Sequence, residues 1–268
     1  MSRQRLAELF SSCRDENRAA LLPYMTAGLP DPAGSVRLFA AMADAGADGF
    51  EVGIPYADPL MDGPVIQEAG DRALAAGSGV DVALDILGQV VATTGKPSVV
   101  MTYVNPVLRM GADAFAARLS GAGASGAIIA DLPVDEARPF ASALARHDLG
   151  LVLFVAPTTT EARLESVVRS SPPFVYGVAE LGVTGERDMA SSHIESLVGR
   201  VRRHGDVPVV AGVGIATPDQ AHRAAAAADG VIVGSALVRR VMEADSVDGA
   251  AGSLRQAVGD FARAMQRD

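Results

Sequence analysis

The chain has 268 residues, of which 49% are hydrophobic and 21% charged, and its formal net charge is −9. This length can bury one large core, so we expect a single domain over residues 1–268. The absence of an eighteen-residue apolar run and of a signal-peptide core excludes membrane and secreted proteins and predicts a cytoplasmic location, while the acidic balance excludes a nucleic-acid partner.

Residues 3–12 predict a helix that precedes the first strand and covers the bottom of the fold. Eight short runs rich in Val, Ile and Phe follow, each with an Ala-rich stretch of helical spacing after it. Because these runs are continuous rather than alternating, they are typical of strands covered on both faces. The predicted strands are 20–26, 49–53, 97–103, 126–132, 150–156, 174–179, 207–212 and 230–234. The predicted helices are 35–46, 64–76, 81–93, 111–122, 135–147, 160–170, 191–203, 217–228 and 247–266.

This alternation predicts an α/β protein, a single (β/α)8 TIM barrel with an extra N-terminal helix. A doubly wound open sheet is the alternative. Eight repeats, with no Gly-x-Gly-x-x-Gly after the first strand, favour the barrel. In such a barrel the active site lies at the C-terminal ends of the strands, so the candidate residues are sought there.

Glu51 lies inside the second predicted strand, between Phe50 and Val52. It is either a paired core carboxylate, a residue on a frayed strand end, or a functional acid. The nearest cations in sequence fall on predicted helices, and an unpaired buried carboxylate is costly, which favours the functional interpretation. Burial would raise its pKa and let it donate a proton near neutral pH.

The loop over residues 55–64 is rich in proline and carries two acids. Asp58 precedes a proline and is explained by turn chemistry. Asp62 precedes Gly63, which lets the chain bend back and aim this carboxylate at Glu51. For Asp62, a turn and a functional role are both open.

Two glycine-bearing stretches late in the chain, residues 211–215 and 234–236, follow the last two predicted strands. The second of them opens a helix at Ser235. Loops after strands seven and eight commonly bind phosphate in this fold, because backbone N–H groups and a helix N-terminus favour an anion. Residues 182–185 are either a lid with a further N–H donor or a surface loop.

Scarce residue types limit the chemistry. Lys96, the only lysine, precedes the third predicted strand and so lies at the end of the barrel away from the site. The histidines lie on predicted helices or their ends, and Cys13 is the only cysteine, so neither a histidine nor a thiolate metal site is expected. Acid–base chemistry by carboxylates is what these exclusions leave.

Residues 50–64, with the sequence FEVGIPYADPLMDGP, resemble the most specific motif of the tryptophan synthase α subunit family. Six further matches follow in chain order: residues 23–28, 101–106, 131–133, 182–185, 212–215 and 234–236. The resemblance implies a (β/α)8 barrel that cleaves indole-3-glycerol phosphate to indole and glyceraldehyde 3-phosphate, a retro-aldol reaction without Schiff base or metal.

By the same resemblance, Glu51 is the catalytic acid and base, and Asp62 accepts the indole N–H and stabilises the charge on the protonated ring. The implied substrate-binding residues are Tyr24, Tyr103, Ile128, Tyr176 and Thr184, and the implied phosphate-binding residues are Gly185, Gly214, Gly234 and Ser235. No cofactor is expected in this chain. Pyridoxal phosphate is expected in a tryptophan synthase β subunit, the implied partner in an α2β2 complex.

Four positions, Ala57, Ala179, Glu180 and Val213, depart from the family pattern. None removes a catalytic group, and all but Val213 lie in the loops that close the site and signal to the β subunit in this family. Two alternatives therefore accompany the main hypothesis: a stand-alone lyase that releases free indole, and a regulatory subunit without turnover.

Overall fold

The computed structural model describes residues 2–170, 173–178, 187–212 and 214–267. Within these residues, eight parallel strands pair in chain order, and β8 pairs with β1 to close a barrel. The strands are β1 (Ala20–Thr26), β2 (Phe50–Gly53), β3 (Ser98–Thr102), β4 (Gly126–Ile129), β5 (Gly150–Val155), β6 (Val175–Val178), β7 (Val209–Gly212) and β8 (Gly230–Val233). The predicted (β/α)8 fold is confirmed, and the open-sheet alternative is wrong because β1 hydrogen-bonds to both β2 and β8.

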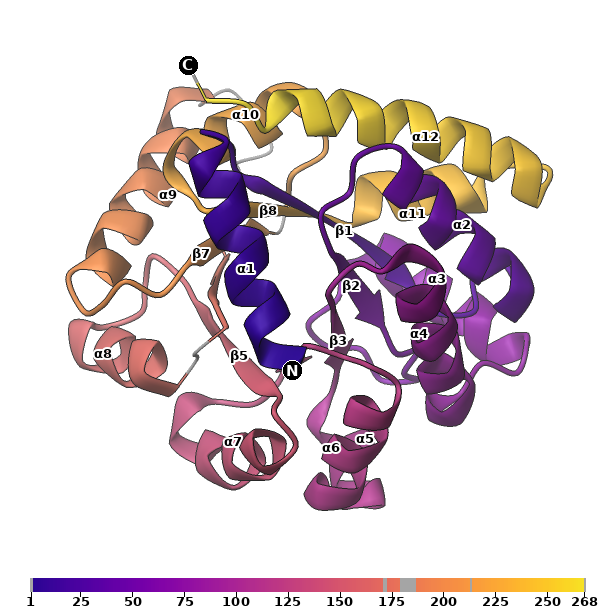
Figure 1. Ribbon diagram of the computed structural model, residues 1–268, viewed down its shortest axis with the longest axis horizontal. Coiled ribbons are helices and arrows are strands. Elements are labelled where there is room, and N and C mark those ends of the chain that lie inside the picture. The colour runs from indigo at the N-terminus through magenta and orange to yellow at the C-terminus, as the bar shows by residue number, and fades with distance from the viewer. Residues whose placement is uncertain (1, 171–172, 179–186, 213, 268) are drawn as a thin grey trace.

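Helices surround the barrel (Figure 1). They are α1 (Ser2–Asp15), α2 (Pro32–Asp44), α3 (Pro64–Ala75), α4 (Val80–Thr94), α5 (Val104–Met110), α6 (Ala112–Gly121), the 3-10 helix η1 (Val134–Glu136), α7 (Ala137–Arg146), α8 (Glu161–Ser170), α9 (Arg187–Arg202), α10 (Pro218–Ala227), α11 (Ser235–Met242) and α12 (Val247–Ala264). No single helix in the described ranges is long and apolar enough to cross a membrane, and one pair, α3 with α4, meets the length and composition criteria jointly but is bent by 102°.

Local signals fix several helix starts. Asp31 caps α2 by accepting a hydrogen bond from Gly34 N at 2.8 Å, which starts the helix at Pro32, three residues before the predicted start. Thr217 and Gln220 form a reciprocal capping box at α10, and Ser246 caps α12. Such caps satisfy backbone N–H groups that have no partner within the helix.

α5 was not predicted, because its cap comes from a distant part of the chain. Its first N–H, on Val104, donates to Asp131 Oδ1 at 2.7 Å. Asp131 lies in the loop after β4, 27 residues further on, where a sequence window around 104 cannot detect it.

α1 covers the N-terminal end of the barrel, as predicted, and lies across the strands inside the ring of the other helices (Figure 1). Leu6, Leu9 and Phe10 are buried there. The Phe10 ring packs edge-on against Phe174, just before β6, with centroids 5.8 Å apart. With this end closed, the cavity of the barrel opens at the opposite end.

Candidate active site

A cavity of about 660 Å³ opens at the C-terminal ends of the strands. Its walls come from the barrel interior, the loop after β2 and the segments that follow β5, β7 and β8. The described lining residues are Tyr24, Glu51, Met61, Asp62, Gly63, Pro64, Val65, Ile66, Met101, Ala130, Phe154, Val155, Ala156, Thr159, Tyr176, Val178, Gly214, Ile215, Ile232, Gly234, Ser235 and Arg239.

Glu51 lies in β2 with only 3% of its surface exposed, beside Tyr24 in the strand register. Its Oε2 atom has no hydrogen-bond partner among the described residues. Burial raises the pKa of this carboxyl to about 8, and the nearby charge of Asp62 adds to the rise. Glu51 is therefore not paired through Oε2 with any described residue, it does not lie on a frayed strand end, and its raised pKa favours the protonated form at neutral pH.

Asp62 lies in the loop between β2 and α3 and faces the same cavity. The loop is tied locally, because Asp62 N donates to Pro59 O at 3.0 Å and Gln67 Nε2 donates to Asp62 O at 2.8 Å. Burial raises the pKa of the Asp62 carboxyl to about 6, and a hydrogen bond from Tyr103 opposes the rise. Asp58, by contrast, is exposed and absent from the described lining.

The pKa values of the two carboxyls are therefore separated. Near pH 7 Asp62 is mainly ionised and Glu51 is mainly protonated. One cavity thus offers a proton donor and a negative charge side by side, which suits acid–base chemistry on a substrate that develops positive charge.

Two tyrosines stand in the barrel mouth because two glycines make room for them. A Cβ atom at Gly53 would lie 2.2 Å from the Tyr24 hydroxyl, and one at Gly212 would lie 2.2 Å from the Tyr176 hydroxyl. Phe154, on β5, packs against Tyr176 with ring centroids 4.7 Å apart. Together these rings form an apolar slot next to Glu51.

Tyr103 and Ile128 are buried but are not among the described residues that line the cavity. The Tyr103 ring stacks on Tyr56, with centroids 5.0 Å apart, and its hydroxyl accepts a hydrogen bond from Met61 N at 3.1 Å. It holds the loop that carries Asp62. This geometry therefore does not place the Tyr103 or Ile128 side chain in direct contact with a ligand in the cavity.

Ile128 is in register with Met101, so both face the barrel interior. Met101 lines the cavity, and on the strand of Ile128 the lining residue is Ala130, two positions further on. Because the side-chain period of a strand is two residues, Ala130 is the next interior position above Ile128. Ile128 itself is fully buried and is not among the described residues that line the cavity.

The predicted phosphate-binding residues Gly214, Gly234 and Ser235 all line the cavity. Gly214 has a positive φ of 79°, a backbone conformation that favours glycine. Gly234 precedes α11, and no side chain caps this helix. The first backbone N–H groups of α11 therefore remain available to an anion.

Thr184 and Gly185 lie outside the described residues, as do Ala179, Glu180 and Val213. Their predicted roles remain predictions.

Among the lining residues that the sequence did not predict are Phe154, Thr159 and Arg239. Phe154 is half-buried inside an otherwise buried strand, and its position one residue before the end of β5 was the available signal. Arg239 follows Ser235 by one helical turn, so the helical period after residues 234–236 would have found it. Thr159 gave no such signal, because it lies in the loop after β5, where its Oγ1 accepts a hydrogen bond from Ala156 N at 2.9 Å.

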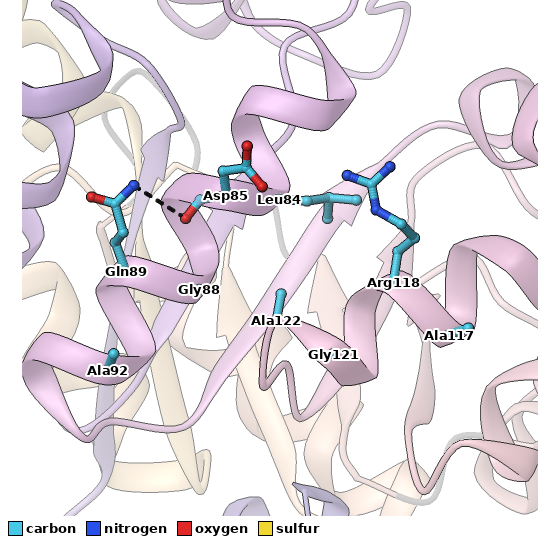
Figure 2. Close-up of a pocket in the computed structure, with 9 residues that line it drawn as sticks. All are labelled: Leu84, Asp85, Gly88, Gln89, Ala92, Ala117, Arg118, Gly121 and Ala122. Atoms are coloured by element: carbon cyan, nitrogen blue, oxygen red, sulfur yellow. Dashed lines mark hydrogen bonds between the residues drawn. The ribbon is translucent and has the colours of Figure 1, made fainter.

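A second hollow of about 660 Å³ lies outside the barrel, between α4 and α6 (Figure 2). Small residues, among them Gly88 and Ala122, line most of it. Arg118, its one described basic residue, is paired with Asp81 at 2.5 Å. This groove contains no buried unpaired titratable group of the described chain, so the barrel cavity is the candidate site.

The single lysine and the histidines lie where the sequence predicted them. Lys96 directly precedes β3 at the N-terminal end of the barrel, and the histidines lie on or next to helices. The described residues contain no group of three or more His, Cys, Asp or Glu side chains that could hold a metal ion.

The fold and site define a (β/α)8-barrel protein whose cavity holds two carboxyls with raised pKa values and the uncapped start of α11. Residues 10–266 match the tryptophan synthase alpha chain family. The chain is 47% identical over 234 residues to the tryptophan synthase alpha chain of Mycobacterium marinum, covering 87% of each protein. It is 43% identical over 262 residues to that of Acidothermus cellulolyticus, covering 98% of this chain and 97% of the relative.

Among solved structures, a tryptophan synthase from Mycobacterium tuberculosis superposes with a TM-score of 0.89 at 43% identity, covering 98% of this chain and 99% of that one. The tryptophan synthase subunit alpha of Legionella pneumophila has a TM-score of 0.89 at 32% identity, over 97% and 98% of the two chains. The chain belongs to the tryptophan synthase alpha chain family, whose activity is the lyase cleavage of indole-3-glycerol phosphate.

Proposed function

We propose that Glu51 and Asp62 carry the cleavage of indole-3-glycerol phosphate in this single barrel domain. The observation that carries the assignment is the pair of cavity carboxyls whose pKa values lie on opposite sides of neutral pH. Glu51, protonated and with its Oε2 atom lacking a hydrogen-bond partner among the described residues, is the proton donor to the indole ring carbon that bears the glycerol chain. Asp62, ionised, accepts the indole N–H and stabilises the positive charge on the protonated ring.

The step balances with these two residues alone. Protonation of the ring carbon makes the ring an electron acceptor, and the bond to the glycerol chain then breaks with its electron pair returning to the ring. The neighbouring hydroxyl loses its proton to the Glu51 carboxylate and becomes the aldehyde of glyceraldehyde 3-phosphate. Glu51 ends in its starting state, so the reaction as proposed requires neither a metal nor a cofactor of this chain.

The two parts of the substrate bind at opposite ends of the cavity. The indole ring occupies the slot formed by Tyr24, Phe154 and Tyr176, with Tyr103 and Ile128 supporting the wall from behind. The phosphate lies at the opposite end, where its proposed backbone ligands are Gly185, Gly214, Gly234 and Ser235, and Thr184 is the proposed lid residue that reaches to Asp62.

We further propose that a tryptophan synthase β subunit docks at the mouth of the barrel in an α2β2 complex, that it holds the pyridoxal phosphate, and that the reaction takes place in the cytoplasm. The support is a set of large apolar side chains at this end. Leu60 is 80% exposed, Met61 64% and Leu108 60%, on the loop after β2 and on α5. Exposed apolar groups of this size at one end of a barrel favour a protein partner.

The test is the rate of indole release from indole-3-glycerol phosphate by the purified chain, alone and with a β subunit. We expect a low rate alone and a strong rise with the partner. Glu51→Gln should lower kcat about 10³-fold or more, since a positioned general acid contributes about 10²–10⁴-fold. Full activity of Glu51→Gln would refute the assignment, and a high rate that is indifferent to the partner would refute the coupling.

A further inference from the structure

We propose that Arg239 is a substrate-binding residue whose guanidinium pairs with the phosphate monoester of the substrate at the first turn of α11. The inference rests on the proposed function, because it adds a residue for the same substrate.

The acidic cavity needs a cationic side chain to bind a phosphate dianion. Its described lining includes two acids, Glu51 and Asp62, and the protein as a whole carries a net charge of −9. A phosphate dianion that enters this cavity is repelled by that charge. Among the described lining residues, Arg239 is the one Lys or Arg side chain.

The helix geometry directs Arg239 to the phosphate end. Ser235 and Arg239 are four residues apart on α11, so they share one face of the helix, and both line the cavity. Side chains on a helix lean toward its N-terminus, so Arg239 extends back over the turn that begins at Ser235. Free N–H groups at this uncapped terminus and the guanidinium therefore converge on one place.

Arg239 is not engaged elsewhere in the part of the chain that the structure describes, where it is exposed and has no ion pair. Two nearby arginines, by contrast, have partners. Arg240 donates to Ser253 Oγ of α12 at 3.2 Å, and Arg72, on the packed helix α3, pairs with Glu68 at 2.5 Å. Arg240 is also absent from the described lining of the cavity, so it provides a matched control on the same helix.

The experiment compares Arg239→Gln, Arg239→Lys and Arg240→Gln with the unmodified chain, using glycerol 3-phosphate and indole as separate probes in calorimetric titrations. We expect Arg239→Gln to weaken glycerol 3-phosphate binding about tenfold, because a charge-assisted hydrogen bond to phosphate is lost. Arg240→Gln should change it less than twofold. Indole carries no charge, so its dissociation constant should be the same in all four proteins, and Arg239→Lys should recover part of the phosphate affinity.

Three results would overturn the inference: an unchanged glycerol 3-phosphate affinity in Arg239→Gln, an equal loss in both glutamine variants, or a parallel loss of indole binding. The second would indicate a general effect of net charge and the third a structural role. The cleavage rate of the unmodified chain tests the proposed function separately. If the unmodified chain cleaves the substrate and the Arg239→Gln variant binds glycerol 3-phosphate normally, only the role of Arg239 is contradicted.

Discussion

Two carboxylates only three residues apart, Asp48 and Glu51, show how differently the two ends of the barrel are built. Asp48, before β2 at the closed end, accepts two hydrogen bonds from the Arg18 guanidinium at 2.7 and 2.9 Å and a third from Leu21 N at 2.8 Å. Glu51, inside β2, has one oxygen without a partner among the described residues. The Asp48 carboxylate thus has its hydrogen-bond partners within the protein, whereas one Glu51 oxygen has none among the described residues.

The same contrast extends to other groups at each end. At the closed end Asp229 accepts from Val209 N at 2.9 Å and from Arg14 at 3.4 Å, and α1 covers the strands. At the open end Asp62 has a raised pKa. The difference teaches that the polar groups at the closed end are paired and stabilise the fold, whereas the open end leaves one oxygen of the buried Glu51 without a partner among the described residues, at a cost to stability.

The largest expected effect concerns Glu51→Gln at high pH. The pKa of Glu51 is raised from 4.5 to about 8 in the folded chain, so its favourable contribution is present below pH 4.5 and is lost as the pH rises toward 8. Glutamine cannot ionise. At pH 9 the variant should therefore be more stable by on the order of 4 kcal/mol, and near pH 4 the two proteins should be equal.

Urea unfolding at pH 4, 7 and 9 measures this difference. A Glu51→Gln chain that is less stable than the unmodified chain at pH 9 would show that the ionised carboxylate is satisfied in the folded state, and the contrast with Asp48 would fail.

Asp48→Asn should act in the opposite way. It removes the charge that pairs with a largely buried Arg18, whose pKa is raised chiefly by its hydrogen bond to Asp48. We expect a loss of about 3 kcal/mol in the free energy of unfolding, with kcat of the folded protein unchanged. Asp44→Asn, at an exposed position on α2, is the control and should change stability by less than about 0.5 kcal/mol. A fall in kcat with Asp48→Asn would mean that the two ends are not independent.

The pH dependence of kcat sharpens the assignment at the open end. Activity should rise as Asp62 loses its proton, with a pKa of about 6, and fall as Glu51 loses its proton, with a pKa of about 8. Beyond each limit the rate should change about tenfold per pH unit. Initial rates between pH 5 and 9.5 test the bell shape, and Asp62→Asn should abolish the acidic limb while it lowers the maximum. An acidic limb that persists in this variant would assign it to another group.

The smallest effect is expected for Arg14→Ala. This side chain is 61% exposed and its ion pair with Asp229 is long, at 3.4 Å. Exposed pairs of this kind contribute about 0–1 kcal/mol, so the loss should be below about 0.5 kcal/mol in urea unfolding at 0.15 M salt. A loss as large as that of Asp48→Asn would show that the closed end depends on its exposed pairs as well.

Much of the site could be predicted because residues at strand ends meet at one end of a parallel barrel. Glu51, Gly214 and Ser235, which the sequence placed at strand ends in this way, all line the cavity. Ile128 was placed by resemblance alone, and the layer it occupies depends on the strand register, which the sequence does not state. The helical period places Arg239 on the same face of α11 as Ser235, but only the direction of this helix relative to the cavity shows that the face lines it.

The sequence by itself determined the alternation of eight strands with helices and the first helix, which covers the barrel. It also pointed to carboxylate acid–base chemistry, because it excluded lysine and histidine from the site. It could do so because hydrophobic period and residue type are local properties. Tertiary structure alone decided the cap that Asp131 gives to α5, the separation of the Glu51 and Asp62 pKa values, and the way in which Gly53 and Gly212 accommodate the tyrosine hydroxyls. These features depend on burial and on contacts between residues far apart in the chain, and both exist only once the barrel has closed.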